Sequence, residues 1–288
     1  MNQFSLSANI ETGFPEGSQY IVTPNAKKVL AEIVNGYQSG IHSYTIIGTY
    51  GTGKSSFLIA LQNDLSGRSK KKYIFDNIDV LGCEKVETLN IVGDYASLPL
   101  LLARKLNIEG NTASVLDALR AYCNKLNAKN TFLVIMIDEF GKILEHAAKK
   151  DPEGELYFMQ KLAEFANVPT RKVILLTTLH QNFSAYAKGL SQAQRNEWNK
   201  VKGRFKEVVF VEPVEQILKT LKEKAVNAAN DSNTDSDRQT IQDEPPQSMT
   251  RTPSTCTRIS FTLRPVYSST LYFTVSIRLS QTVLMLTP

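Results

Sequence analysis

The stretch Gly48-Thr49-Tyr50-Gly51-Thr52-Gly53-Lys54-Ser55 follows the pattern G-x-x-x-x-G-K-[ST], which is typical of loops that hold phosphate groups. Residues 43–47 before it predict a short buried strand, and residues 56–62 after it predict a helix. A strand, a loop and a helix in this order are the setting in which the pattern is most specific. The stretch therefore predicts a binding site for a nucleoside triphosphate.

The residue types of the loop explain the prediction. Gly51 and Gly53 allow backbone conformations that side chains exclude, so successive N–H groups can turn toward a phosphate, and the new helix adds the positive end of its dipole. Lys54 is expected to reach the β- and γ-phosphates, and the Ser55 hydroxyl to ligate Mg²⁺. The alternative is an ordinary glycine-rich turn with a solvated lysine. The predicted nucleotide-binding residues are Gly48, Thr49, Tyr50, Gly51, Thr52, Gly53, Lys54, Ser55 and Ser56.

The composition is that of an ordinary globular protein with a mild positive charge. The chain has 288 residues, enough for one large domain or two modest ones. Residues 1–224 carry 28 Lys and Arg against 23 Asp and Glu (28 − 23 = +5), and the rest carry 5 against 5. This balance permits contact with nucleic acid but does not argue for it.

The cysteines and the start of the chain indicate a cytoplasmic protein. Cys83, Cys123 and Cys256 are widely spaced and share no metal-binding spacing with the three histidines, so we expect reduced thiols. Residues 1–18 lack the basic and apolar regions of a signal peptide. No apolar run approaches the roughly 20 residues of a membrane span, so we expect no membrane partner.

Predicted strands and helices alternate along the chain. The apolar runs at residues 131–137 and 172–178 predict central strands of a parallel sheet, buried on both faces. The other predicted strands are 86–92 and 208–211, and the other predicted helices are 24–37, 98–106, 113–126, 141–150, 155–166, 183–203 and one that opens at Pro213. Residues 151–154 are expected to separate two helices, and a loop at residues 182–189 is an alternative. The alternation predicts a three-layer α/β sandwich with a mostly parallel sheet.

Asp138 and Glu139 follow the apolar run at residues 131–137, at the carboxyl end of its strand. Open α/β sheets bind ligands beside these ends, so we expect the pair to face the phosphate loop. An aspartate there can hold Mg²⁺, and the next glutamate can polarise the attacking water as a general base. The alternative is that both residues cap the following helix. Because the chain also has a complete phosphate loop, we favour the catalytic interpretation.

The spacing and the residue sequences of these motifs resemble those of the AAA+ ATPases. Asp138 lies 84 residues after Lys54 (138 − 54), with the strand at residues 86–92 between them in the chain. This spacing, with a glutamate directly after the aspartate, is similar to the P-loop division whose sheet has an additional central strand. GTYGTGKSSFL, IDEFGKILE, TTLHQNF and the GRF segment resemble bacterial AAA-type ATPases, a group often associated with phage defence. The resemblance covers residues 20–224 and implies an AAA+ domain, ATP and Mg²⁺ as ligands, and a homo-oligomer with composite ATP sites.

The resemblance also implies two further catalytic residues. In the family, the strand after the acidic pair ends in a polar residue that senses the γ-phosphate; Thr178 is our choice, with His180 behind it. Arg204 lies in a segment that resembles the family's arginine-finger box, so it would reach the γ-phosphate in a neighbouring subunit. Gly203 stands where the family has serine, and Arg195 is a competing candidate. The alternatives are a structural hydrogen bond for His180 and solvent-facing side chains for both arginines.

The two ends of the chain differ from the central part. Residues 1–19 are predicted to be an irregular lead-in. From about residue 225, a polar, linker-like stretch precedes a segment rich in Ser, Thr and Arg. AAA+ proteins carry a helical lid there, but residues 225–288 show no amphipathic helical pattern. We therefore expect the lid to be missing and the tail to be a truncated or frame-altered end; a small β appendage is the alternative.

Three functions follow as hypotheses. The leading one is an ATPase: Lys54 and Ser55 hold phosphate and metal, Asp138 holds metal and Glu139 activates water, and hydrolysis rearranges a partner protein or nucleic acid. The second is a nucleotide-dependent switch that binds ATP with little turnover. The third is a nucleic-acid-binding motor, supported by the mild positive charge and a basic cluster at residues 68–72, for which a solvated loop is the alternative. The preference for ATP over GTP comes from the resemblance alone.

Overall fold

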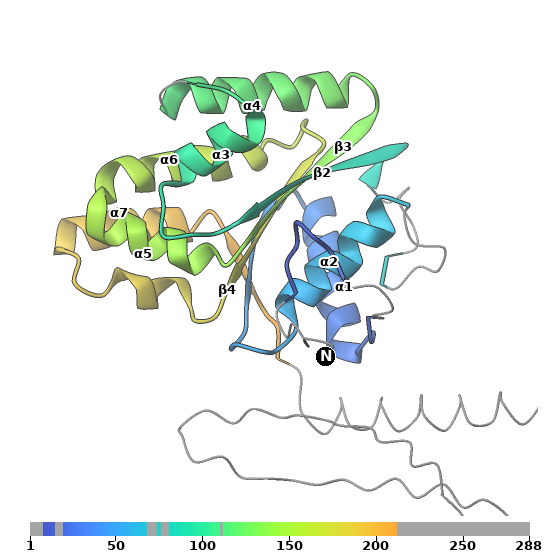
Figure 1. Cartoon of the computed structure of the whole chain (residues 1–288), viewed down its shortest axis with the longest axis horizontal. Helices are drawn as coiled ribbons and strands as arrows, with labels where there is room; N and C mark the ends of the chain where they lie inside the picture. The colour runs from blue at the N-terminus through green and yellow to red at the C-terminus, as the bar shows by residue number, and fades with distance from the viewer. Residues whose placement is uncertain (1–7, 15–19, 68–73, 76–80, 110–111, 212–288) are drawn as a thin grey trace, which may run out of the picture. The chain divides into compact units, whose positions relative to one another are not determined.

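The structure is a computed structural model and describes residues 8–14, 20–67, 74–75, 81–109 and 112–211 (Figure 1). Several predictions fall outside these ranges: the basic cluster at residues 68–72, the helix that opens at Pro213, and the tail at residues 225–288 with its missing lid. These features stay predictions.

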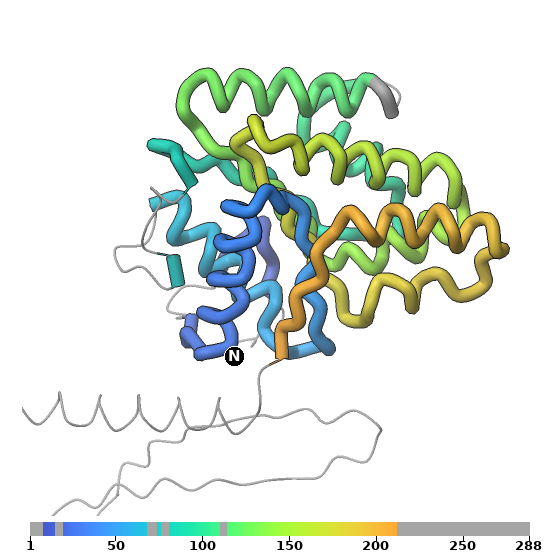
Figure 2. The backbone as a smooth tube through the Cα atoms, turned by 180° about the vertical axis from the view of Figure 1, so that it is seen from behind, coloured from blue at the N-terminus to red at the C-terminus, as the bar shows by residue number. Residues whose placement is uncertain are grey.

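Among the described residues, parallel strands form one five-stranded sheet in the order β2-β3-β4-β1-β5. The strands are β1 (Ser43–Ile47), β2 (Lys85–Val92), β3 (Thr131–Asp138), β4 (Val173–Leu179) and β5 (Lys206–Val209). The helices are α1 (Pro24–Gln38), α2 (Lys54–Leu65), α3 (Leu98–Leu106), α4 (Thr112–Asn127), α5 (Phe140–Lys150), α6 (Pro152–Ala166) and α7 (Gln192–Lys202), with the 3-10 helix η2 (Phe183–Ala187) before α7. In Figure 2 the blue segment of β1 runs beside the orange segment that contains β5, although the two are far apart in the chain.

Capping side chains fix where several helices begin. The Thr23 hydroxyl accepts a hydrogen bond from the Ala26 N–H at the start of α1. Asp151 caps α6 in the same way, and Pro152 occupies the first turn, so α6 begins inside the break predicted at residues 151–154. Ser191 forms a capping box that starts α7, which divides the predicted helix at residues 183–203 into η2 and α7.

Strand β5 begins and ends two residues earlier than the predicted range of 208–211. Its length is set by its partner β1, because the pairing runs from Tyr44 opposite Lys206 to Ile47 opposite Val209. The phosphate loop follows Ile47, so β1 offers no further strand backbone to pair with. The register of the partner therefore outweighs the apolar run in fixing the bounds of β5.

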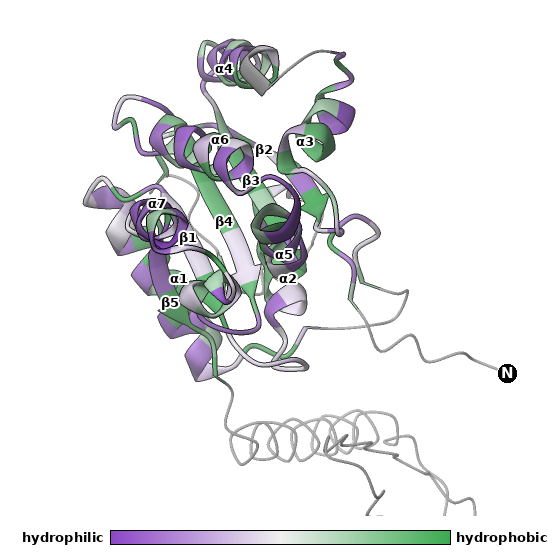
Figure 3. Ribbon diagram, turned by 90° about the vertical axis from the view of Figure 1, so that its left-hand side faces the viewer, coloured by the Kyte–Doolittle hydropathy of each residue, from purple (hydrophilic) through white to green (hydrophobic). Residues whose placement is uncertain are grey.

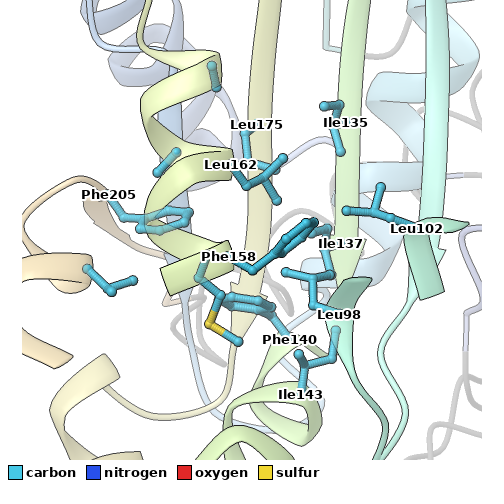
Figure 4. Close-up of a cluster of buried hydrophobic side chains, with 14 of the residues drawn as sticks. Leu98, Leu102, Ile135, Ile137, Phe140, Ile143, Phe158, Leu162, Leu175 and Phe205 are labelled. Carbon is cyan, nitrogen blue, oxygen red and sulfur yellow. The ribbon is translucent and has the colours of Figure 1, made fainter. Parts of the chain in front are cut away.

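The sheet separates two hydrophobic layers. Alternate residues of β3 face opposite sides, since Phe132, Val134 and Met136 pack with α1 and α2, and the residues between them pack with α3 to α6. Figure 1 shows the corresponding arrangement of α1 and α2 on one side of the sheet and α3 to α7 on the other. Figure 4 shows side chains from α3, α5 and α6 meeting those of β3 and β4. In Figure 3, hydrophobic green follows the strands, and the surrounding helices carry both colours, as expected for helices with one buried side.

The predicted α/β three-layer fold is confirmed. The prediction of an additional central strand rested on residues 86–92, but a different strand takes the central position. That strand is β4, which pairs with β1 on one side and with β3 on the other. Strand β2, which lies between the two motifs in the chain, is at the edge of the sheet. The sheet therefore keeps the phosphate loop and the acidic pair one strand apart.

Residues 8–14 contain neither a helix nor a paired strand of the sheet, yet they pack on the folded part. Ile10 is completely buried, and its carbonyl oxygen accepts a hydrogen bond from Asn90 Nδ2 of β2. Glu11 forms an ion pair with Lys105 of α3. This part of the predicted lead-in thus contributes to the core. None of the described helices is both long and apolar enough to cross a bilayer.

Candidate active site

The phosphate loop lies between β1 and α2, as its sequence predicts. Gly51 and Gly53 have φ angles of 77° and 91°, in the left-handed region that favours glycine, and Gly53 is the residue before the first turn of α2. Gly48 is needed for a different reason, because a Cβ there would lie 2.2 Å from the carbonyl oxygen of Phe210. Ser55 and Ser56 follow Lys54 in the first turn of α2, where unpaired N–H groups and the helix dipole attract anions.

The Lys54 side chain turns back and contacts the phosphate loop. Its ammonium group donates hydrogen bonds to the carbonyl oxygens of Gly48, at 2.6 Å, and Thr49, at 2.9 Å. Burial lowers the pKa of the Lys54 ammonium, and the carboxylates of Asp138 and Glu139 oppose this effect. The acidic pair is therefore within electrostatic reach of the phosphate loop. The predicted juxtaposition of the two motifs is present.

The pairing of the strands explains this proximity. Ile47 of β1 lies opposite Leu179 of β4, and Thr177 of β4 lies opposite Ile137 of β3. The three strands are parallel, so all of them end at the same edge of the sheet. This carboxyl edge is where open α/β sheets bind ligands.

Asp138 is buried and has one carboxylate oxygen committed to hydrogen bonds. Its Oδ1 accepts from the Thr178 hydroxyl, at 2.5 Å, and from the Glu139 N–H, at 3.0 Å. No residue that the structure describes donates a hydrogen bond to its Oδ2. A carboxylate oxygen and the Ser55 hydroxyl are hard oxygen donors of the kind that Mg²⁺ prefers, so these two residues fit such an ion.

Glu139 follows with an unusual backbone conformation. Its φ of 51° lies in the left-handed region, which is uncommon for a residue with a side chain and is frequent at functional sites. Its carboxylate, about half exposed, forms an ion pair with Lys142 one turn along α5. Gly93, directly after β2, permits this turn, because a Cβ there would lie 2.3 Å from the Glu139 carbonyl oxygen.

Thr178 and His180 take different places at the end of β4. The Thr178 hydroxyl is buried and bonded to Asp138, while the Glu139 N–H donates to the same hydroxyl at 3.0 Å. His180 lies closer to the surface, stacked against Tyr50 of the phosphate loop with ring centroids 4.3 Å apart. Burial and the charge of Lys54 lower the pKa of His180, which favours the neutral imidazole.

Arg204 lies away from these groups. It precedes β5, whose first residue pairs near the start of β1, so it lies at the amino edge of the sheet, opposite the phosphate loop. Its guanidinium donates two hydrogen bonds to Glu164 Oε1, at 2.8 and 3.1 Å, and one to the Lys200 carbonyl oxygen. Arg195, the competing candidate, is exposed on α7. Arg204 therefore does not lie beside the phosphate loop of its own chain.

Several residues of this arrangement were not predicted from the sequence. Lys142 was detectable, since it stands three residues after Glu139 at the start of a helix, where side chains on one face meet. Gly93 was detectable as a glycine at the end of a predicted strand. Tyr186 and Glu164 gave no such signal, because each reaches its partner through tertiary packing.

Comparisons with known proteins add only a similarity of fold. No protein-family model and no curated protein sequence matches the chain. Among solved structures, the ORC2 protein of Aeropyrum pernix in its ADPNP–ADP complexes is similar over 75% of this chain and 55% of that one, at 14% identity and a TM-score of 0.46. The Walker-type ATPase PABY2304 of Pyrococcus abyssi is similar over 72% and 59% of the two chains, at 14% identity and a TM-score of 0.41. PCH-2 of C. elegans is similar over 66% and 44%, at 14% identity and a TM-score of 0.36. This chain thus spans less than two thirds of each of these proteins, and similarities at this level carry no argument about chemistry.

Proposed function

We propose that the chain is a Mg²⁺-dependent ATPase with its site at the carboxyl edge of the sheet. The observation that carries the proposal is the meeting of three groups there: the phosphate loop with Lys54, the buried Asp138, and Glu139. The phosphate loop follows β1 and the acidic pair lies at the end of β3, and each of the three groups has the chemistry that hydrolysis of a phosphoanhydride requires. Ordinary helix capping by Asp138 and Glu139 would not explain why Asp138 bonds to Thr178 across the sheet.

Binding of the triphosphate would use contacts that the loop now makes with itself. The carbonyl oxygens of Gly48 and Thr49 hold the Lys54 ammonium, and phosphate oxygens would replace them as its acceptors. The backbone N–H groups at the start of α2 would hold the remaining phosphate oxygens. Ser55 and Asp138 would hold Mg²⁺, which neutralises charge that develops on the phosphates.

The chemical step is assigned to Glu139. Its carboxylate would accept a proton from the attacking water while the water oxygen bonds to the γ-phosphorus and the bond from that phosphorus to the bridging oxygen breaks. The products are ADP and inorganic phosphate. The hydroxyl of Thr178 holds Asp138, and we keep it as the candidate that senses the γ-phosphate through this contact. Glu139 must first exchange its ion pair with Lys142 for the water.

The wider assignments rest on the resemblance to AAA+ proteins. They include the preference for ATP, the coupling of hydrolysis to rearrangement of a partner protein or nucleic acid, and the role in phage defence. They also include a homo-oligomer with composite sites, in which Arg204 at the amino edge would serve a neighbouring copy. A cytoplasmic location also stays part of this proposal.

Steady-state release of phosphate from Mg·ATP tests the proposal. Glu139→Gln should bind Mg·ATP as the wild type does and lower kcat by about 10²–10⁴-fold, the usual contribution of a general base. Glu153→Gln, an exposed glutamate on α6, is the matched control and should leave kcat unchanged. Equal turnover by the wild type and Glu139→Gln, with Mg·ATP bound to both, would rule out catalysis by this site.

A nucleotide-dependent switch is the second candidate, and the ion pair between Glu139 and Lys142 favours it. A carboxylate that is paired with a lysine is not available to bind and orient the attacking water, so a chain that keeps this pair would bind ATP with little turnover. Lys142→Met distinguishes the two functions. The variant should gain activity over the wild type if the pair suppresses hydrolysis, whereas an active enzyme that already opens the pair should gain none.

A further inference from the structure

Tyr50 stands at the tip of the phosphate loop and is 77% exposed, yet its ring is held in place. It stacks on the imidazole of His180 with 23° between the ring planes, and its hydroxyl lies 3.1 Å from His180 Nε2. Both a stacking contact and a hydrogen bond therefore join the phosphate loop to the residue that follows β4. Burial raises the pKa of the Tyr50 phenol, and the nearby Glu139 carboxylate adds to the rise.

His180 is held on its other side by Tyr186 of η2. The Tyr186 hydroxyl lies 3.1 Å from His180 Nε2 and 3.3 Å from Nδ1, and the two rings meet edge to face. Tyr186 is almost completely buried, and its hydroxyl passes close over Gly141 of α5, where a Cβ would lie only 2.3 Å away. Gly141 thus provides the space in which Tyr186 can reach His180.

The 3-10 helix η2 is also hydrogen-bonded to α7. The carbonyl oxygen of Phe183 in η2 accepts a hydrogen bond of 2.9 Å from Trp198 Nε1, and both side chains are completely buried. The Phe183 ring also stacks with Phe205, the neighbour of Arg204 in the chain. Continuous contacts therefore connect the tip of the phosphate loop, the end of β4, η2 and the end of α7.

We propose that Tyr50 is a positioning residue of the nucleotide site that transmits the presence of a γ-phosphate, through His180 and Tyr186, to η2 and α7. The inference rests on the proposed function. A phosphate bound beside the loop tip repositions the backbone that carries Tyr50, and the Tyr50 ring cannot move without changing its stack on His180. Because His180, Tyr186 and the η2–α7 contact are packed side chains with defined partners, the shift passes on as a repacking of this cluster. Contiguity alone does not demonstrate coupling, so the contacts must be tested by a response at the far end.

The chain contains a built-in reporter for this response. Trp198 is its single tryptophan and lies at the far end of the contacts. Its emission would be recorded while the full chain is titrated with Mg²⁺ and either ADP or a non-hydrolysable ATP analogue, and binding would be measured separately by calorimetry. In the wild type we expect the ATP analogue to change the Trp198 emission more than ADP does.

Tyr50→Ala should still bind both nucleotides, lose most of the emission change, and lower the preference for triphosphate over diphosphate by about five-fold or more. Tyr50→Phe, which keeps the stack and removes the hydrogen bond, should fall between the two. Tyr157→Ala is the matched control, since Tyr157 is an exposed tyrosine on α6 without a contact to His180. A full emission change in Tyr50→Ala, or none in a wild type saturated with the ATP analogue, would overturn the inference alone. A wild type that binds neither nucleotide would overturn the proposed function and the inference together.

Discussion

Asn127 and Asn167 at the amino edge of the sheet join distant segments, whereas Lys54 and Glu139 at the carboxyl edge bond only to residues near them in the chain. At the amino edge, side chains reach across to the backbone of neighbouring loops: Asn127 bonds to Thr131 and Lys172, and Asn167 bonds to His42 and Arg204. At the carboxyl edge, Lys54 bonds only to its own loop, and Glu139 pairs with its near neighbour Lys142.

This difference separates groups that hold the fold from groups that are available to a ligand. Bonds that join distant segments are lost only when those segments part, so they contribute to stability. A lysine or glutamate bonded to its own turn can exchange that partner for a phosphate or a water while the fold stays intact. Lys54 and Glu139 are therefore the groups at the carboxyl edge that can change partners during a reaction, while the hydrogen bond between Asp138 and Thr178 holds β3 to β4.

The largest expected loss of activity is at Arg204. This residue lies at the amino edge but has a proposed catalytic role, so a catalytic effect there would be an exception to the division between the two edges. Arg204→Ala should lower kcat by about 10³-fold or more, because a guanidinium that stabilises transition-state charge is removed. Mixing Arg204→Ala with Lys54→Ala should restore part of the activity, since one copy then supplies the arginine and the other the phosphate loop.

Arg195→Ala is the matched variant for this experiment. If it abolishes activity while Arg204→Ala does not, the finger is Arg195, and Arg204 belongs with the structural residues of its edge.

Lys54→Ala is the corresponding test at the carboxyl edge. It should reduce phosphate release by roughly 10²–10³-fold, the usual cost of removing one preorganised electrostatic contact. The melting temperature should hardly change, because the lost hydrogen bonds lie within a single loop. Lys27→Ala, at an exposed site on α1, is the control for both measurements. A large fall in melting temperature would show that Lys54 holds the fold.

Asn127→Ala should show the opposite pattern. Its amide donates to the carbonyl oxygens of Thr131 and Lys172, and its Oδ1 accepts from the Lys172 N–H, so the substitution removes three hydrogen bonds, while the Lys172 carbonyl oxygen keeps the one from the Leu133 N–H. We expect unfolding in urea to reveal a loss of about 2–3 kcal/mol, with kcat per folded molecule unchanged. Asn124→Ala, an exposed site on the same helix, should lose little stability. A fall in kcat without a loss of stability would contradict the division between the edges.

The smallest expected effect is the contribution of the Glu164 carboxylate to stability, which should depend on pH. Hydrogen bonds from Lys161, Gln160 and Arg204 lower the pKa of Glu164 to about 2. Because the pKa is lower in the folded chain, its contribution is complete above the ordinary value of 4.5 and is lost as the pH falls from there toward about 2. The side chain is partly exposed, so we expect at most about 1 kcal/mol.

The measurement is the melting temperature of the wild type and Glu164→Gln against pH. The difference between them should be present at pH 7 and shrink as the pH falls below 4.5. A difference that does not depend on pH would mean that the charge of Glu164 makes no contribution.

Much of the fold was predictable from the sequence. The buried runs of β3 and β4 are apolar enough to identify central strands, and the glycines of the phosphate loop specify its backbone. Proximity of Asp138 and Glu139 to Lys54 followed from the rule that parallel strands end at the same edge. These features depend on local sequence or on a general property of parallel sheets.

Other features depend on contacts that no local pattern records. The sequence placed a strand at residues 86–92 but not its position at the edge of the sheet, since strand order is decided by tertiary packing. It proposed His180 for its place after β4, but the stack on Tyr50 joins residues 130 positions apart in the chain, and the contact with Tyr186 depends on the path of the chain into η2. The ion pair of Arg204 with Glu164 joins residues 40 positions apart in the chain.

The central claim is that the carboxyl edge binds Mg·ATP through the phosphate loop. Calorimetric titration of Mg·ATP into the wild type, Lys54→Ala and Asn127→Ala tests it most directly. We predict one site per chain in the wild type and in folded Asn127→Ala, and binding weakened by roughly 10²-fold or more in Lys54→Ala. Equal binding by all three proteins, or none by the wild type, would contradict the account.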